Sequence, residues 1–136
     1  MSFTTDFIHF VRTDTELGFG TAVSNRIHPS TYTGTAYPAC VYNERGGDYD
    51  QYGYAGSKTF KATRMQLDVY APSNAIGYTV LSDLKTRVVD RLGKYSGPMG
   101  AAGATSVKTT QILDIRIMAT GEADLSRLLI DIELQH

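Results

Sequence analysis

The chain has 136 residues, of which 42% are apolar and 20% charged, an ordinary globular composition for one domain with a substantial core. A net charge of −1 and a sequence pI of about 6.3 exclude a strongly basic protein that wraps nucleic acid or coats an anionic membrane. The single cysteine, Cys40, excludes an internal disulfide and a thiolate metal cluster within one chain.

The first residues, MSFTTDFIHFV, contain no basic segment followed by an apolar run, so we expect no signal peptide. No apolar run approaches the roughly 20 residues that a membrane-spanning helix needs. We therefore expect a soluble protein that is made in a cytoplasm and has no membrane partner.

The N-terminal segment carries two helix signals. Residues 4–6, Thr-Thr-Asp, offer N-caps for a first helix, and residues 13–14, Thr-Asp, offer a second start. Gly18 and Gly20 argue against one smooth helix. We expect one or two short helices whose apolar sides are formed by Phe7, Ile8, Phe10 and Val11 and then by Leu17, Phe19 and Val23.

A strand is predicted at residues 39–43, because the proline of Tyr37-Pro38 is tolerated at the first position of a strand. Cys40 lies in this strand, and we expect it to be a buried small hydrophobic side chain rather than a nucleophile. The next residues, 44–57, read ERGGDYDQYGYAGS and hold four glycines and three tyrosines but few aliphatic residues. They predict an exposed flexible loop or a long hairpin tip at about 44–58.

Residues 64–92, RMQLDVYAPSNAIGYTVLSDLKTRVVDRL, form the most informative segment. Its first part alternates between Met65, Leu67 and Val69 on one side and Arg64, Gln66 and Asp68 on the other, which predicts a half-buried strand. The Ala-Pro-Ser at 71–73 ends the strand, since proline cannot donate to the ladder and serine is a good N-cap. A helix is predicted from residue 74, with Gly93 at its C-terminal end and an apolar face of Ile76, Val80, Leu81, Leu84, Val88 and Leu92.

The rest of the chain predicts a second loop and two strands. A glycine-rich segment, SGPMGAAGATS, predicts a flexible loop at about 96–106. In the first strand, Leu113, Ile115 and Ile117 alternate with Asp114 and Arg116. In the second, Leu128, Ile130, Ile132 and Leu134 alternate with Asp131, Glu133 and Gln135. This last strand is a candidate exposed sheet edge that pairs with a neighbour.

These elements predict an α+β protein with a single domain over residues 1–136. We expect a mostly antiparallel or mixed β-sheet of about four strands, packed on one long helix and one or two shorter N-terminal helices. The sheet face away from the helices would carry the charged residues of the strands and be mildly acidic.

Residues with catalytic chemistry are scattered. His9, His28 and His136 lie far apart and form no metal-binding or carboxylate-paired spacing. The GPMGAAG of residues 97–103 lacks the closing Gly-Lys-Ser/Thr of a phosphate loop and precedes a strand. We therefore expect no enzyme activity and no catalytic, cofactor-binding or metal site.

The tyrosine-rich segment is a candidate assembly interface, because tyrosine supplies contact area at low entropic cost. The alternative is a disordered surface loop that happens to be aromatic. The candidate interface residues are Arg45, Asp48, Tyr49, Asp50, Tyr52 and Tyr54.

The order of these motifs resembles a known family. An N-terminal helical segment precedes a strand opened by proline, YPACVY at 37–42, and a glycine-containing loop follows. The alternating strand, the break and the helix of residues 64–92 come next, and RLLIDIELQH closes the chain. Over most of its length the chain is similar to the tail terminator (tail completion) proteins of long-tailed bacteriophages and related gene transfer agents.

The resemblance implies a structural virion protein without a catalytic site. Such proteins form a ring, usually of six copies, at the head-proximal end of the tail tube, assembled in the host cytoplasm. The ring stops tube polymerisation and provides the docking surface for the head connector. The implied partners are further copies of the chain, the major tail tube protein and the head–tail connector or stopper protein, while DNA passes through without sequence-specific binding.

Two hypotheses and two alternatives accompany this interpretation. A weakly acidic surface that includes Asp68, Asp131 and Glu133 is a candidate lining of the ring lumen, because phosphate contacts to Lys and Arg dominate nucleic-acid affinity. The loop at residues 46–56 would become ordered on a neighbouring subunit or on the tube. The alternatives are a head-side connector or stopper protein of the neck and a cytoplasmic ligand-binding or enzymatic α+β domain.

Overall fold

The computed structural model describes residues 3–52, 58–103, 105–120 and 124–136. Its helical elements are α1 (Phe3–Thr13), α2 (Phe19–Ala22), α3 (Ala75–Leu92) and the 3-10 helix η2 (Ala101–Gly103). Its strands are β1 (Ile27–Pro29), β2 (Ala39–Tyr52), β3 (Lys58–Pro72), β4 (Gly97–Met99), β5 (Thr105–Val107), β6 (Thr109–Ala119) and β7 (Leu125–Gln135).

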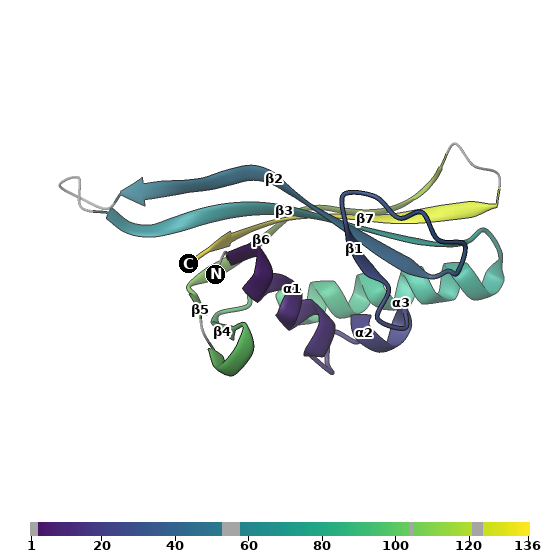
Figure 1. Cartoon of the computed structure of the whole chain (residues 1–136), viewed down its shortest axis with the longest axis horizontal. Coiled ribbons are helices and arrows are strands. Elements are labelled where there is room, and N and C mark those ends of the chain that lie inside the picture. The colour runs from purple at the N-terminus through teal and green to yellow at the C-terminus, as the bar shows by residue number, and fades with distance from the viewer. Residues whose placement is uncertain (1–2, 53–57, 104, 121–123) are drawn as a thin grey trace.

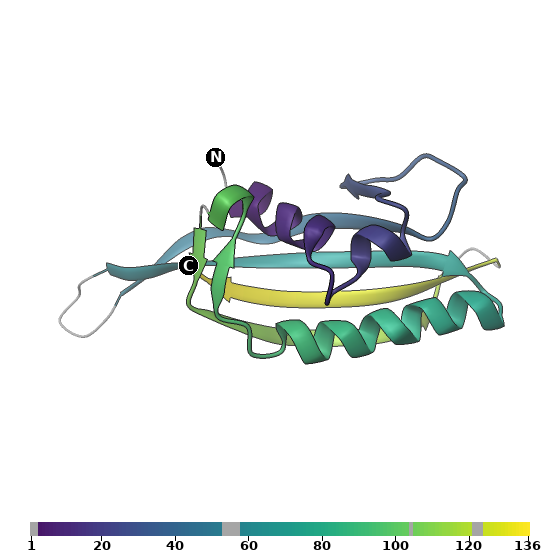
Figure 2. The same ribbon diagram turned by 90° about the horizontal axis from the view of Figure 1, so that it is seen from below.

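Five strands form one mixed sheet in the order β1-β2-β3-β7-β6, and β4 pairs with β5 in a separate small ribbon. Among the strands that the structure describes, β1–β2 is the one parallel pair and the others are antiparallel. Helices α1, α2 and α3 all lie against one face of the sheet (Figure 1), and Figure 2 shows that face from the helix side. The predicted α+β class, with a mixed sheet on one long and two shorter helices, is confirmed; the main sheet has one strand more than expected.

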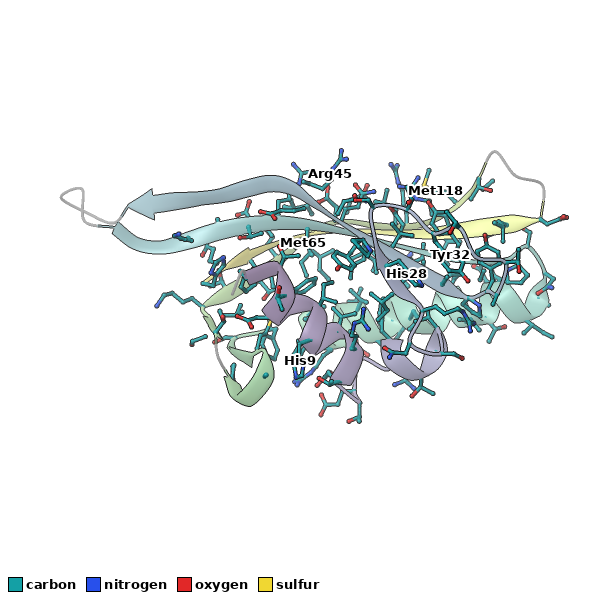
Figure 3. All side chains as sticks on the ribbon, viewed as in Figure 1. His9, His28, Tyr32, Arg45, Met65 and Met118 are labelled. Carbon is teal, nitrogen blue, oxygen red and sulfur yellow. The ribbon has the colours of Figure 1, made fainter. Side chains whose placement is uncertain are left out.

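Strict alternation in the two central strands builds the core. Met65, Leu67 and Val69 of β3 are completely buried, and Met65 points from the sheet toward the helices (Figure 3). The predicted inner residues of β7 are also completely buried: Leu128, Ile130, Ile132 and Leu134. The inward sides of both strands were therefore predicted correctly.

Helix α3 begins on a side-chain cap. The carboxamide oxygen of Asn74 accepts a hydrogen bond from the Gly77 backbone N–H at 2.8 Å, so asparagine and not Ser73 is the cap. Gly77 lies so close to the preceding strand that an added Cβ would be 1.9 Å from the Pro72 carbonyl oxygen. This contact explains how a strand and a long helix share so short a connection.

The face that α3 buries differs at one end from the prediction. Leu81, Leu84, Val88 and Leu92 are buried as expected. Ile76 is 79% exposed, because glycine at position 77 is the residue that faces the sheet in the first turn. Gly93 ends the helix with a right-handed φ of −55° rather than the left-handed conformation typical of a terminal glycine.

The N-terminal helices are separated by a turn that a carboxylate holds. Asp14 accepts a hydrogen bond from the Leu17 N–H at 2.9 Å, and Gly18 adopts a left-handed φ of 72° before α2. Arg91 of α3 donates to both carboxylate oxygens of Asp14 at 3.0 and 3.1 Å. The turn is thus fastened to the long helix. The expected buried residues of both helices lie in the core.

Both segments predicted as loops contain regular structure. Residues 44–52 continue β2, so the hairpin alternative holds there, and β3 begins at Lys58. The loop predicted at 96–106 is wrong: β4 and β5 pair, and Met99 and Val107 enter the core. Gly100, at φ 91°, lies directly against Asp6, which accepts a hydrogen bond from the Thr105 hydroxyl. Asp6 is therefore buried inside α1 and is not an N-cap.

The last strand is central and not an edge, which corrects the prediction. β7 lies between β3 and β6 from Ser126 to Gln135, and β6 is the outermost strand on that side. A register shift between Ile112 and Asp114 turns Leu113 outward, where it is 41% exposed instead of buried.

Candidate assembly surface

Asp68, placed by sequence among exposed acidic residues, is buried. It is 5% exposed and accepts a hydrogen bond from Arg127 Nε at 2.9 Å, while Arg127 Nη2 lies 2.9 Å from the same oxygen. Gln66 donates to its other oxygen at 2.9 Å. The prediction that Asp68 lies on an exposed acidic face is therefore wrong.

The segment at residues 30–38, which joins β1 to β2, explains this burial. It faces the outer side of β2 and β3 across a pocket of about 290 Å³. The ring of Tyr32 in this segment stacks on His28 of β1 at a centroid distance of 4.9 Å (Figure 3). Tyr32 also meets Tyr37 edge-on at 5.6 Å. The pocket is lined by Ser30, Thr31, Tyr32, Tyr37, Val41, Asn43, Asp68, Tyr70 and Leu125.

The carboxylates of β6 and β7 on the outer face also have basic neighbours. Arg64 Nε donates to Asp131 Oδ1 at 2.9 Å, and Arg116 Nε lies 3.4 Å from Asp114 Oδ2. Glu133 is half-buried directly opposite Arg64 in the β3–β7 register. Each carboxylate thus has a basic neighbour, so this face is closer to charge balance than the strand sequences alone indicated.

Two sheet edges are open over the described residues. β1 covers only Cys40 to Tyr42 of β2, so residues 43–52 have no further strand beside them there. β6 is the other edge, and all 11 of its residues border that side of the sheet. Exposed sheet edges present backbone N–H and C=O groups that can pair with another chain.

The predicted interface residues lie on or beyond the β2 edge. Arg45 is exposed and lies on the sheet side away from the helices (Figure 3). Asp48, Tyr49, Asp50 and Tyr52 belong to β2, whose backbone pairs Tyr49 with Ala62 and Tyr52 with Lys58. Tyr54 lies outside the described residues. Their role in assembly stays a prediction.

The β2–β3 hairpin projects beyond the helices as an arm (Figures 1 and 2). β7 pairs with β3 only as far as Ala62, so the arm beyond that residue is a two-stranded ribbon. Its base is held by His136, whose backbone exchanges hydrogen bonds with Lys61 at 2.8 and 2.9 Å. The His136 ring stacks on Phe3 at 3.8 Å and its Nε2 lies 2.9 Å from Thr63 Oγ1. Sequence reasoning missed this role.

Apolar side chains are exposed on α3 beside the β6 edge. Tyr78 is 58% and Val89 46% exposed, and they share one helical stripe with Ser82 and Lys85. Helix α3 contacts β6, so the helix that carries this stripe lies next to the open edge of the sheet. The sequence held one signal for this stripe: of the neighbours Val88 and Val89, only one can face the core.

The described residues show little of the chemistry of a reaction centre. No group of three or more His, Cys, Asp or Glu side chains among them could hold a metal ion. Cys40 is completely buried, and this burial raises the pKa of its thiol well above the ordinary value. The prediction of a buried small side chain at Cys40 is confirmed. None of the helices described in this structure combines the length and apolar character needed to cross a membrane.

Comparison with known proteins gives a structural answer only. No family model and no curated protein matches the sequence. Among solved structures, a chain in the virion of a native gene transfer agent particle aligns with a TM-score of 0.64 at 13% identity, over 97% of this chain and 91% of that one. This chain has the fold of a gene transfer agent virion chain. A second solved structure, whose name describes no function, aligns with a TM-score of 0.51 at 15% identity, over 100% of this chain and 97% of that one.

Proposed function

We propose that this protein is a structural component of a phage or gene transfer agent virion, and specifically a tail terminator. It forms a ring, of six copies by the family resemblance, on the head-proximal end of the tail tube, stops polymerisation of the tube protein and presents a docking surface to the head connector. The observation that carries the proposal is the match to a gene transfer agent virion chain over 97% of this chain and 91% of that one.

The shape of the subunit supports ring formation. A closed ring of identical subunits uses heterologous contacts, in which two different surfaces of the chain meet. The sheet has two different open edges, β6 and the outer part of β2, on opposite sides. The projecting β2–β3 arm extends the β2 edge beyond the helices.

The charge distribution supports passage of DNA without retention. The net charge is −1, and Arg64, Arg116 and Arg127 on the outer face each lie within 3.4 Å of an aspartate in the same subunit. Guanidinium groups engaged in this way contribute less to phosphate binding, which dominates nucleic-acid affinity. In this proposal, Asp131 and Glu133 remain candidates for the lumen lining, whereas the buried Asp68 does not.

The proposal is tested with the purified chain and the tail tube protein of the same particle. Light scattering and electron microscopy of the chain should show a ring, and its addition to polymerising tube protein should shorten the tubes. A monomer at all concentrations that leaves tube length unchanged would refute the terminator. Recovery of the protein with isolated heads rather than isolated tails would instead favour the head-side connector or stopper role.

A further inference from the structure

We infer that the ring closes by continuing the β-sheet from one subunit to the next, with the β6 edge of one copy pairing with the open part of β2 in its neighbour. The inference rests on the proposed ring and specifies which surfaces meet. Both edges belong to the same sheet, so a second copy of this chain is the partner that fits them.

The strand directions match the requirement for such a joint. β2, β3, β7 and β6 are successively antiparallel, so β2 and β6 run in opposite directions. When a neighbouring copy is placed alongside in the same orientation, its β2 lies antiparallel to β6. The extended sheet then keeps the antiparallel pattern of the subunit, in which each backbone N–H faces a carbonyl.

The open parts of the two edges lie at the same height in the sheet. Following partners across the strands, Asp114 is level with Asp131, Gln66 and Asn43. Thr109 is level with Gln135, Ala62 and Tyr49 by the same route. Residues 109–114 of β6 therefore lie level with the part of β2 that β1 does not cover. Two copies can pair along these segments without a shift of one copy along the strand direction.

Side chains on the outer face complement one another at this height. Arg45 is exposed on the outer side of the β2 edge (Figure 3), and Asp114 of β6 lies on the same outer face as its β7 partner Asp131. In the joined sheet, Asp114 of one copy is level with Asn43 of the next, and the long side chain of Arg45, two residues along β2, reaches it diagonally beside Arg116. Opposite charges across neighbouring strands stabilise a pair, and like charges destabilise it.

Unfinished packing at both edges points to the same joint. Ile112, Ile115 and Ile117 of β6 face the core and remain only partly buried. The arm is a two-stranded ribbon, and isolated ribbons are marginally stable until a third strand joins them. Both edges also carry register shifts at the level of the joint, between Ile112 and Asp114 and between Glu44 and Gly46. Such bulges bend a strand, which favours a curved and closing sheet over a flat open one.

Disulfide crosslinking tests the joint. The natural Cys40 is completely buried, so only the introduced cysteines are available to form disulfides. A chain with Arg45→Cys and Gln111→Cys should, on oxidation, give a ladder of covalent multimers on a denaturing gel, because Gln111 is level with Glu133, Arg64 and Gly46, the residue next to Arg45. Each single variant can at most form dimers, and Arg45→Cys combined with Thr86→Cys on α3 is the matched control that should not form a ladder. The same test with Asp114→Cys or Arg116→Cys in place of Gln111→Cys covers registers slipped by two and by four residues.

Rings in the microscope without a ladder from any of the three pairs would overturn the sheet joint and leave the proposed function intact. If the double-cysteine variant stays monomeric under reducing conditions while the natural chain forms rings, the joint is tested with charge substitutions instead of crosslinking. Arg45→Glu should raise the concentration at which rings form by up to about fivefold per interface. Adding Asp114→Arg should restore it, and failure of this rescue would overturn the joint. A natural chain that never forms an oligomer would overturn both the function and the joint.

Discussion

The buried ion pair between Asp68 and Arg127 makes the sharpest prediction about the fold. Replacing Arg127 with methionine keeps much of the side-chain volume and removes the positive charge. The Asp68 carboxylate, 5% exposed, would then retain only the hydrogen bond from Gln66. Removing one partner of a buried pair costs about 3–5 kcal/mol, and because Arg127 is 27% exposed the expected loss is at the low end, about 3 kcal/mol. For a domain of this length that corresponds to a melting temperature lower by about 10 °C.

The chain contains a matched control for this experiment. Arg116 pairs with Asp114 on the same sheet face, but their side chains are 59% and 42% exposed. Arg116→Met should change the free energy of unfolding by less than about 1 kcal/mol, because exposed pairs contribute little. Urea denaturation of the two variants measures the difference, and Asp68→Asn added to Arg127→Met should recover part of the loss. Equal stabilities of the two single variants would show that the segment at residues 30–38 does not bury Asp68.

Three further predictions concern the connection from β3 to α3 and the thiol. Gly77→Ala should destabilise the fold by about 2 kcal/mol or more, since its Cβ would lie 1.9 Å from the Pro72 carbonyl oxygen, whereas Thr79→Ala on the exposed side should be nearly neutral in the same urea titration. Asn74→Ala should cost about 1 kcal/mol through loss of the cap, and Asn74→Asp should retain most of it; equal losses in both would argue against the cap. Cys40 should resist a thiol reagent in the native protein from pH 7 to 9, because burial both shields the thiol and raises its pKa so that little thiolate forms, and it should react once in denaturant; rapid native labelling that increases with pH would contradict its burial.

Sequence patterns predicted the core residues best in elements where burial alone determines the pattern. The alternation in β3 and β7 identified Met65 and Ile132 as core residues, since a period of two places every second side chain on the buried face. The pattern failed where one residue was out of phase. Leu113 looked like an inward residue until the bulge in β6 turned it outward. A bulge leaves no composition signal, because it adds a residue without changing its type.

Long-range cover was the second source of error. Asp68 occupies an outward position of β3, and by strand periodicity it belongs with solvated side chains. Its burial depends on a segment some thirty residues away that carries Tyr32 and Tyr37 across the sheet. Local sequence carries no information on which stretch of sheet a connecting segment crosses. This cover removes Asp68 from the candidate acidic surface.

The order of strands in the sheet was the third source of error, and it matters most for assembly. The alternation of β7 is the same whether the strand has one neighbour or two, so the last strand could be mistaken for an edge. The structure places it in the centre and transfers the edge to β6, whose outward Asp114 and Arg116 had looked like ordinary surface residues. The glycine-rich residues after 44 were expected to form the interface as a loop or a hairpin tip, and those up to Tyr52 continue a strand whose outer side is open. An assembly surface made of backbone edges depends on which strands lack neighbours, so it becomes visible only when the strand order is known.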